Sequence, residues 1–323
     1  MKRALVTGGA GFVGSTLADR LLGDGIEVVA YDNLATGRPE FVAGVAKHPL
    51  GTFVEGDVLD AERLVAALEG CDTVFHLAAN ADVRDGLSHP QRDLQQNTIG
   101  TWTVLEAMRH VQVKRIAFSS TGSVYGEPEV FPTPEDAPFP IQTSLYAASK
   151  LAGEGLIGAY CHGYGFTGVV YRFVSILGER YTHGHVYDFF AKLKGDPSRL
   201  HVLGDGRQEK SYLYVQDCVS GILRGLERAA FDPGFDVYNL GTDETVVVDQ
   251  SVGIITRELG LEPVIEHAGG RRGWAGDSPL IHLDCAKIRA LGWAPTMTIE
   301  QAIVRTLRWL EANPGVFEPR VAA

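Results

Sequence analysis

Short apolar runs alternate with helix-forming segments through the first half of the 323-residue chain, and this alternation limits the possible folds most strongly. The apolar runs are nearly continuous blocks rich in Val, Ile, Leu and Phe: RALVTG, EVVAYD, TFVEGD, DTVFHLAA, RIAFSS and GVVYRF. Such blocks are typical of strands that are covered on both faces of a parallel sheet. The segments between them, such as GSTLADRLLGDG and AERLVAALEG, have the period of a helix. The sequence therefore predicts βαβ units wound into an α/β fold with a doubly wound parallel sheet.

The pattern loosens after about residue 174, where Gly, Pro, Asp and His become frequent. We predict that residues 1–174 form the sheet domain and that residues 175–323 form a smaller C-terminal α/β lobe. Parts of this second segment are expected to return to the first, with a ligand site between the two. Helices are expected in the second segment near 186–195, 215–229, 249–259 and 298–312.

A glycine-rich turn follows the first strand. The segment VTGGAGFVGSTLADRLL places Gly8, Gly11 and Gly14 between the end of that strand and the opening of the first helix. One glycine allows the tight turn, one lets a pyrophosphate approach bare backbone, and one permits close helix–strand packing. The helix N-terminus adds unpaired N–H groups and a partial positive charge. The turn predicts a dinucleotide-binding sheet of the Rossmann type.

Two carboxylates follow the next two strands. Asp32 ends the second strand, at about the distance along the chain where an acidic side chain would meet the adenosine ribose. It would accept hydrogen bonds from both ribose hydroxyls and repel a 2′-phosphate, which favours NAD over NADP. The alternative is that Asp32 only caps a turn. Asp57 would accept a hydrogen bond from the adenine amino group, or else be the N-cap of a helix.

Composition excludes several classes of function. The formal net charge of −11 argues against nucleic acid or an acidic membrane surface as a general partner. No run approaches the roughly 18–20 apolar residues of a membrane span, and MKRALVTGG is interpreted as a first strand rather than a signal peptide. The cysteines form no Cys-x-x-Cys pair, which favours a reduced cytoplasmic protein. His183, His185 and His201 lack the spacing and the neighbours of a metal site, so no metal is expected.

The segment TSLYAASKLAGE sets Tyr146 and Lys150 four residues apart, on one face of a predicted helix. A free phenol has a pKa near 10, and lowering that pKa to about 7 requires about 4 kcal/mol. A cation about 4 Å away contributes on that order at an effective dielectric of about 20, so Lys150 and a positively charged nicotinamide ring together would suffice. Tyr146 would then be a general base for a substrate hydroxyl, with Thr121 sharing the hydrogen bond. The alternative is a structural Tyr–Lys pair.

These features, with several further motifs in the same order, resemble the extended short-chain dehydrogenase/reductase family, specifically the nucleotide-sugar 4-epimerases related to UDP-galactose 4-epimerase. The motifs span nearly the whole chain: TGGAGFVG, YDNL, GDV, FHLAA, SSTGSVYG, YAASK, GDGRQEKSYLYVQD and RRGWAGD. The resemblance implies that NAD takes a hydride from C4 of a sugar and returns it to the other face of a 4-keto sugar. The implied function is inversion of C4 of a UDP-hexose, with UDP-glucose and UDP-galactose as the first candidates.

The resemblance also assigns site residues. The implied catalytic residues are Thr121, Tyr146 and Lys150. The implied NAD contacts, besides Tyr146 and Lys150, are Gly8, Gly11, Phe12, Val13, Gly14, Asp32, Asn33, Leu34, Thr36, Gly37, Asp57, Val58, Leu77, Ala78, Ala79 and Ser119. The implied substrate contacts, besides Thr121 and Tyr146, are Arg84, Ser123, Ser175, His185, Val186, Val202, Lys210, Arg272 and Asp277. Ser175 replaces the Asn that is usual in the family. Lys210 stands where the family often has a diphosphate-binding Arg, although an exposed Lys is usually only solvated.

Alternative reactions and substrates remain open. Relatives that dehydrate or decarboxylate carry an acidic residue just before VYG, where this chain has Gly122 and Ser123, and this favours epimerisation. Ile281 aligns near the position that admits a 2-N-acetyl group and would narrow the pocket, yet UDP-N-acetylhexosamines and UDP-glucuronate stay possible substrates. Another NAD-dependent nucleotide-sugar oxidoreductase or isomerase is the second hypothesis. A nicotinamide-sensing binding protein is the third.

A partner is also implied. The helical segments QNTIGTWTVLEAMRHV and YAASKLAGEGLIGAYCHGYG would lie side by side. In relatives this pair of helices forms a four-helix contact between two subunits, so a homodimer is expected.

Overall fold

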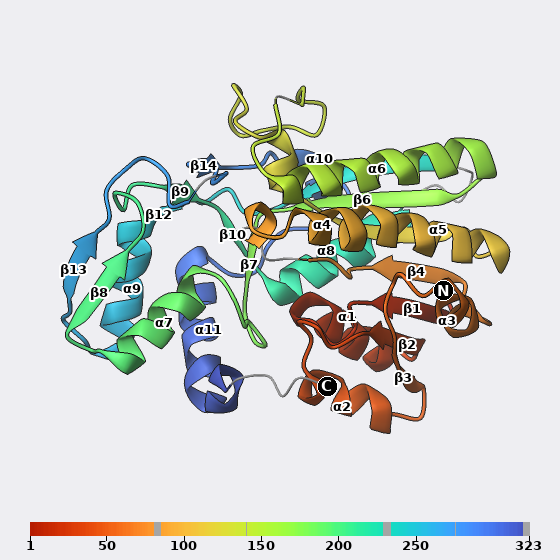
Figure 1. Cartoon of the computed structure of the whole chain (residues 1–323), viewed down its shortest axis with the longest axis horizontal. Coiled ribbons are helices and arrows are strands. Elements are labelled where there is room, and N and C mark those ends of the chain that lie inside the picture. Colours follow the sequence, from red (N-terminus) through yellow and green to blue (C-terminus); the bar gives the residue numbers. More distant parts are fainter. Residues whose placement is uncertain (81–84, 140, 229–233, 275, 319–323) are drawn as a thin grey trace.

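A sheet of seven parallel strands, with the order β11-β6-β5-β4-β1-β2-β3, forms the centre of the molecule (Figure 1). The computed structural model describes residues 1–80, 85–139, 141–228, 234–274 and 276–318. The strands are β1 (Arg3–Thr7), β2 (Glu27–Asp32), β3 (Gly51–Glu55), β4 (Thr73–His76), β5 (Arg115–Thr121), β6 (Thr167–Phe173) and β11 (Gly234–Leu240). The predicted doubly wound parallel sheet is confirmed. The apolar pattern identified six of its strands and missed β11.

Consecutive residues of the central strands face two different hydrophobic cores. Ala4 and Val6 of β1 belong to one core, and Leu5 between them belongs to the other. All three side chains are fully buried. Because successive side chains of a strand point to opposite faces, a strand that is covered on both sides must be apolar throughout. This is why the apolar runs in the sequence do not alternate with polar residues.

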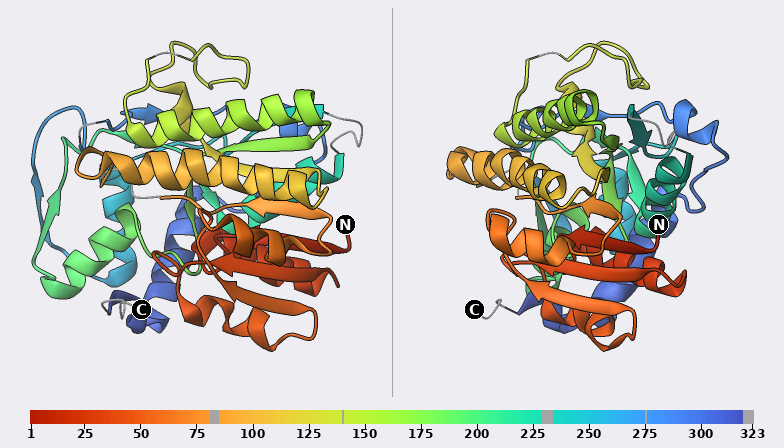
Figure 2. Two further views of the ribbon diagram at one scale, coloured as in Figure 1. Left: turned by 45° about the vertical axis from the view of Figure 1, so that its right-hand side comes forward. Right: turned by 90° about the vertical axis from the view of Figure 1, so that its right-hand side faces the viewer.

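Helices cover both faces of the sheet (Figure 2). On one face α1 packs against α2 and α8, and on the other α5 packs against α3 and α6. Their bounds are α1 (Phe12–Gly23), α2 (Pro39–Lys47), α3 (Ala61–Leu68), α5 (Gly100–His110), α6 (Leu145–Tyr164) and α8 (Val215–Arg228). The short helices of this part are η1 (Asp85–Leu87), α4 (Pro90–Arg92), η2 (Asp93–Ile99) and η3 (Gly122–Tyr125).

Most of the smaller elements of the second half surround a separate core, on the left in Figure 1, whereas Ile281 and Ile288 pack in a core of the sheet domain. Their strands are β7 (Ser175–Leu177), β8 (Arg199–Val202), β9 (Glu209–Lys210), β10 (Tyr212–Tyr214), β12 (Val246–Val247), β13 (Val264–His267) and β14 (Leu280–Ile281). Their helices are α7 (His185–Gly195), α9 (Val248–Leu259), α10 (Ala286–Arg289), α11 (Ile299–Ala312) and η4 (Pro314–Phe317). Helices α7, α8, α9 and α11 lie within one or two residues of the predicted ranges. None of the helices in the described ranges combines the length and apolar character that a bilayer crossing requires.

One expected helix is interrupted. The segment QNTIGTWTVLEAMRHV was predicted as a single helix, but its first residues belong to η2, which is a π-helix, and α5 begins only at Gly100. Single π-turns are often found at functional sites, because they redirect side chains that a regular helix would point elsewhere. The redirected side chain here is Asn97, which is described with the site below.

Candidate active site

The order of the strands creates a crevice beside β1. The chain runs from β1 outward to β2 and β3, and then crosses to β4 on the other side of β1. The loops that follow β1 and β4 therefore leave the sheet in opposite directions at its carboxyl edge, which is where ligands bind in sheets of this kind. The glycine turn follows β1 at this edge.

The glycines of the turn are required by close contacts. Gly8 has a φ of +70°, and a Cβ there would lie 2.8 Å from the backbone nitrogen of Ala78. A Cβ on Gly14 would lie 2.0 Å from the carbonyl oxygen of Gly8. Gly11 is the N-cap of α1 and carries no side chain that could bind the first N–H groups of that helix. These N–H groups are thus suited to bind the pyrophosphate of a dinucleotide.

Phe12 and Val13 begin α1 directly after this turn. The ring of Phe12 packs edge-on against Tyr181 of the second lobe, with 5.7 Å between the ring centroids. Its side chain therefore links the two halves of the molecule, and only its backbone could meet a phosphate. Val13 is partly buried and packs against both of the adjoining cores.

Asp32 holds the glycine turn and the next loop together. One carboxylate oxygen accepts a hydrogen bond from the Ala10 N–H at 2.9 Å, and the other accepts one from the Leu34 N–H at 2.8 Å. Burial raises the pKa of Asp32, and these two backbone hydrogen bonds oppose that shift. Asp32 therefore does cap the turn, as the alternative predicted, and its contact with the ribose stays a prediction. Because a carboxylate has about four acceptor sites, Asp32 retains the capacity to accept ribose hydroxyls as well.

Asp57 is not the cap of the following helix. The N-cap of α3 is Asp60, whose side chain accepts from the Arg63 N–H. Asp57 instead accepts from the Asn33 amide at 2.7 Å, so the loops that follow β2 and β3 are joined. The helix-cap alternative for Asp57 is wrong, and its contact with adenine stays a prediction.

The other predicted NAD contacts follow the same ends of the strands. Ala78 donates its N–H to the Thr7 hydroxyl at 3.2 Å. Gly37 is buried so closely that a Cβ there would lie 2.8 Å from a carboxylate oxygen of Asp32. The remaining predicted contacts in these loops are Leu34, Thr36, Val58, Leu77 and Ala79. They line one edge of the sheet together with the glycine turn.

The predicted Tyr–Lys helix exists and has a defined start. The Ser144 hydroxyl accepts a hydrogen bond from the Ala147 N–H at 3.1 Å and so caps α6. Tyr146 lies in the first turn and Lys150 in the second. The Lys150 Nζ donates to the carbonyl oxygen of Ser119 in β5 at 2.7 Å and lies 4.6 Å from the centre of the Phe118 ring. Lys150 is therefore fixed to the end of β5 and does not point toward solvent.

The protein environment shifts the pKa values of both side chains toward their neutral forms. Burial lowers the pKa of Lys150 to about 7, although the Glu154 carboxylate opposes this shift. Burial, followed by the Asp93 carboxylate, raises the pKa of Tyr146 above its ordinary value. A phenolate at neutral pH thus needs a positive charge in addition to Lys150.

Thr121 ends β5 and begins η3, and its side chain is buried. Its hydroxyl accepts a hydrogen bond from the N–H of Ser123, at 3.1 Å between the two heavy atoms. The hydroxyl can still donate, because this contact uses only an acceptor site. Thr121 and Ser119 lie on the same strand, so Thr121 lies near the residue that holds Lys150.

A polar cluster in the second half brings together several predicted substrate contacts. The Lys210 Nζ lies 2.8 Å from a carboxylate oxygen of Asp277, and Arg272 donates to the Asp277 carbonyl oxygen at 2.7 Å. Arg272 also pairs with Glu127, which follows η3. Burial, and then the charge of Lys210, lowers the pKa of His185 to about 3. These side chains therefore form one group beside η3.

Tyr212 belongs to this cluster, although the sequence analysis did not select it. Its ring lies 4.8 Å from the His185 ring, and in the parallel pair of β7 and β10 it is in register with Ser175. Val186 and Val202 are fully buried in the core of the second lobe. Arg84 lies outside the described residues.

Two further buried side chains lie beneath the Tyr–Lys helix. Asn97 of η2 accepts from the Asn80 N–H at 2.8 Å and donates to the Ser149 hydroxyl at 2.9 Å. It thus joins the end of β4 to α6. His76 lies between the hydroxyls of Thr7 and Thr101, and burial, followed by the charge of Lys150, lowers its pKa to about 3. His76 lies in the FHLAA motif and Asn97 in the segment QNTIGTWTVLEAMRHV, but neither was selected as a site residue, because their neighbours come from distant segments.

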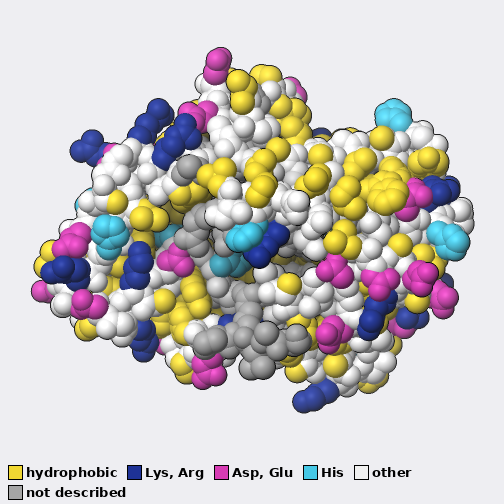
Figure 3. Space-filling view, viewed as in Figure 1, with side chains coloured by type: hydrophobic (Ala, Val, Ile, Leu, Met, Phe, Trp, Pro, Cys, Tyr) yellow, Lys and Arg dark blue, Asp and Glu magenta, His cyan; other side chains and the backbone are white. Residues whose placement is uncertain are grey.

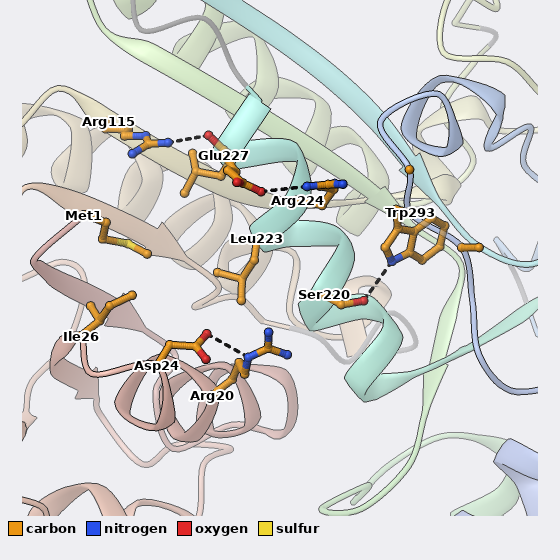
Figure 4. Close-up of a pocket in the computed structure, with 13 residues that line it drawn as sticks. Met1, Arg20, Asp24, Ile26, Arg115, Ser220, Leu223, Arg224, Glu227 and Trp293 are labelled. Carbon is orange, nitrogen blue, oxygen red and sulfur yellow. Dashed lines mark hydrogen bonds and ion pairs between the residues drawn. The ribbon is translucent and has the colours of Figure 1, made fainter.

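A cavity of about 630 Å³ lies at the other edge of the sheet and does not belong to this site (Figure 4). It opens between α1 and α8 and includes Met1, at the amino end of β1. Its three arginines, Arg20, Arg115 and Arg224, already contact an acidic side chain or a carbonyl oxygen. Within the described ranges, no group of three His, Cys, Asp or Glu side chains could hold a metal ion.

The parallel sheet, the glycine turn, Asp32 and the Tyr–Lys helix define a dinucleotide-binding enzyme of the extended short-chain dehydrogenase/reductase type. A family model described as "NAD dependent epimerase/dehydratase family" matches residues 4–241. The chain belongs to this family, and its cofactor is NAD.

Relatives within the family have different names. The chain is 33% identical to the UDP-glucose 4-epimerase of Mycolicibacterium smegmatis over 325 residues, which cover 95% of this chain and 98% of that protein. It is 34% identical to the dTDP-glucose 4,6-dehydratase of Streptomyces griseus, covering 99% and 97%. A crystal structure of UDP-galactose 4-epimerase superposes with a TM-score of 0.85 at 37% identity, covering 96% and 99%.

Proposed function

We propose that this enzyme inverts C4 of a UDP-hexose, with UDP-glucose and UDP-galactose as its substrates. The observation that carries the proposal is the buried Lys150, fixed to the end of β5 one helical turn from Tyr146. This pair is suited to remove a proton from a hydroxyl group at the carboxyl edge of the sheet. The name of the relative from Mycolicibacterium smegmatis supports the same reaction.

NAD, when bound, would supply the acceptor and later the donor of the hydride at C4, and its nicotinamide ring would add a positive charge. Tyr146 would take the proton of the 4-hydroxyl and return it after the 4-keto sugar has turned. Thr121 would orient that hydroxyl through its free donor capacity. Lys150 would stabilise the phenolate, and the charge of the nicotinamide would supply the rest of the pKa lowering that burial and Asp93 oppose.

The surroundings of Gly122 support epimerisation over dehydration. A Cβ at Gly122 would lie 3.2 Å from both the Leu283 side chain and the Phe173 carbonyl oxygen. A side chain at this position would require both neighbours to shift by a few tenths of an ångström, so the site favours glycine over an acidic residue. Without an acid there, a 4-keto sugar would be reduced again rather than lose water.

The polar cluster of Lys210, Arg272 and Asp277 would bind the nucleotide. The two cations suit a diphosphate, and Asp277 suits the ribose. Ile281 pairs with Lys210 in the adjoining strands and is partly buried, which supports a narrow pocket for an unsubstituted hexose. UDP-N-acetylhexosamine and UDP-glucuronate are the alternative substrates.

The test is incubation with each of the four kinds of sugar nucleotide without added NAD. We expect UDP-glucose and UDP-galactose to interconvert, with no deuterium from the solvent entering carbon, since the C4 hydride is returned. Failure to interconvert any of them would contradict the proposal. Release of NADH during turnover would instead indicate an oxidoreductase, and solvent deuterium in the product an isomerase that acts at another carbon.

We also propose that two copies of the chain associate through α5 and α6. These helices lie side by side on the outside of the sheet domain (Figure 1). Apolar side chains gather over them on the face that Figure 3 presents. Trp102 is 47% exposed, and the other exposed apolar residues of η2, α5 and α6 are Leu94, Ile99, Leu145 and Tyr164. An exposed apolar surface of this kind is typical of a subunit contact.

A further inference from the structure

A buried ion pair lies one helical turn beyond Lys150. The side chains of Glu154 on α6 and Arg172 on β6 are only 5% and 4% exposed. The Arg172 Nη2 lies 2.7 Å from Glu154 Oε2, and its Nε lies 3.1 Å from Oε1. Removing two charges from water costs as much as their attraction returns, so stability alone gives little reason to keep such a pair.

Further hydrogen bonds fix the direction of the pair. The Ser120 hydroxyl donates to Glu154 Oε1, on the side of the carboxylate that faces β5. The Arg172 Nη1 donates to the Tyr125 hydroxyl at 2.7 Å and to the Glu135 carbonyl oxygen at 2.9 Å. The carboxylate is thus bound to β5 through Ser120, and the guanidinium is bound to Tyr125 of η3 and to Glu135.

Lys150 and Glu154 are held by neighbouring residues of one strand. Ser119 accepts the Lys150 ammonium through its carbonyl oxygen, and Ser120 donates its hydroxyl to Glu154. The two side chains are four residues apart on α6 and share its buried face. The Glu154 carboxylate raises the pKa of Lys150 against the effect of burial.

The other titratable groups around Lys150 do not supply the negative charge that raises its pKa. His76, from β4, is kept neutral by burial. Tyr146, on α6 itself, is a neutral phenol in the environment that the protein alone provides, because burial raises its pKa. Asp93, from η2, acts on Tyr146 and raises the pKa of the phenol. Arg172, from β6, is positive.

We propose that Glu154 is a positioning residue for the reaction: held by Arg172 and Ser120, its carboxylate keeps Lys150 charged while the ammonium stabilises the Tyr146 phenolate. The proposal rests on the proposed roles of Tyr146 and Lys150. It assigns the buried ion pair to the electrostatics of the site rather than to the stability of the fold.

The test needs a variant that removes the carboxylate without leaving a buried charge unpaired. Glu154→Gln alone would leave Arg172 without its partner, so the variant is Glu154→Gln/Arg172→Gln, whose two amides can bond to each other. The double variant with methionine at both positions is the second choice if the first does not fold. Arg257→Gln/Glu300→Gln is the matched control, because it removes an exposed ion pair of the second lobe.

The first readout is the titration of Lys150 in the purified enzyme, followed by carbon-13 NMR of the lysine Cε and assigned by the loss of one signal in Lys150→Met. We expect the midpoint to fall by about one pH unit in the double variant, and not in the control. The pH at which kcat declines on the alkaline side should fall by the same amount. Above that pH, kcat should be about tenfold lower in the double variant, while KM stays within about twofold.

An unchanged Lys150 midpoint in a folded double variant would overturn the proposal and assign the pair a purely structural role. Glu154→Asp, which keeps the charge, should titrate like the parent, and a midpoint shifted as far as in the double variant would also contradict it. The titration needs no substrate. Failure of every sugar nucleotide to react would therefore overturn the proposed function and leave the result for Glu154 standing.

Discussion

Lys150 carries a charge in the interior of the protein, and burying this charge lowers the free energy of unfolding. Its ammonium is buried, and its pKa falls to about 7 from an ordinary value of 10.5. Between these two values the unfolded chain binds more protons than the folded one, so stability rises as the pH rises from about 7 to about 10. The proposed reaction therefore needs a charged Lys150, whereas the stability of the fold favours a neutral one.

Lys150→Met should lose turnover and gain stability. At pH 6 the parent carries the full cost of the buried ammonium, and we expect the variant to be more stable by about 1 kcal/mol. The gain should shrink as the pH rises from about 7 to about 10, because the folded parent loses the buried charge near pH 7 while its unfolded chain keeps the proton. Urea denaturation at pH 6, 8 and 10 measures this difference. A gain that does not depend on pH would contradict the assigned titration of Lys150.

Tyr146→Phe removes only the hydroxyl that would accept the proton. We expect turnover to fall by about 10³-fold, with little change in the affinity for the nucleotide sugar. The matched control is Tyr164→Phe at the other end of α6, where the side chain is 51% exposed. Kinetic assays together with binding calorimetry separate the two effects, and near-normal turnover in Tyr146→Phe would show that another group is the base.

Sequence spacing predicted some of these residues and not others. Tyr146 and Lys150 were found because both lie on one helix, where four residues make one turn. Glu154 lies on the same helix, but its partner Arg172 comes from β6, and no local spacing connects the two. Asn97 was missed for another reason, since the π-helical turn that directs it is not visible in the hydrophobic period.

At the scale of elements, α6 positions the reactive groups through its first turn. Ser144 caps the helix, and Tyr146 follows it by only two residues. Fraying of this turn would move the phenol as well as weaken the fold. Helix α11 offers a comparison, because Thr298 caps it in the same way far from the Tyr–Lys helix.

Ser144→Ala and Thr298→Ala should therefore differ in activity and agree in stability. Each is expected to lower the free energy of unfolding by about 1 kcal/mol, the usual cost of losing a cap. Only Ser144→Ala should also lower kcat, by about three- to tenfold, since fraying reduces the population of the reactive geometry. Equal kcat values for the two variants would mean that tertiary contacts hold Tyr146 without the cap.

Most elements of the sheet domain were predictable from apolar blocks and helical periods. Strand β11 was not, because its sequence GFDVYNL mixes polar residues into the run, and because it comes from the half of the chain where the pattern is weak. It pairs with β6 along seven residues and covers that edge of the sheet. Helix α2 was missed as well, although Pro39 at its first position is typical of a helix start.

At the scale of the whole molecule, the exposed face of α5 and α6 predicts the state of association. Trp102→Glu places a charge in the centre of the proposed contact and should give monomers at micromolar concentration. Val264→Glu, on an exposed strand of the second lobe, is the control and should leave the mass unchanged. Light scattering gives the molar mass of the two variants and of the parent, and so tests the proposed dimer. A monomeric parent would remove the proposed dimer.

The place of β11 restricts how such a protein can be rearranged by evolution. The chain leaves the sheet after β6, builds much of the second lobe, and comes back to add the outermost strand beside β6. A gene fragment that stops at residue 174 would expose a bare strand edge and lack α8, and its product would be prone to aggregate. New sugar specificities are therefore more accessible through loop replacements on either side of this return than through exchange of a whole terminal module.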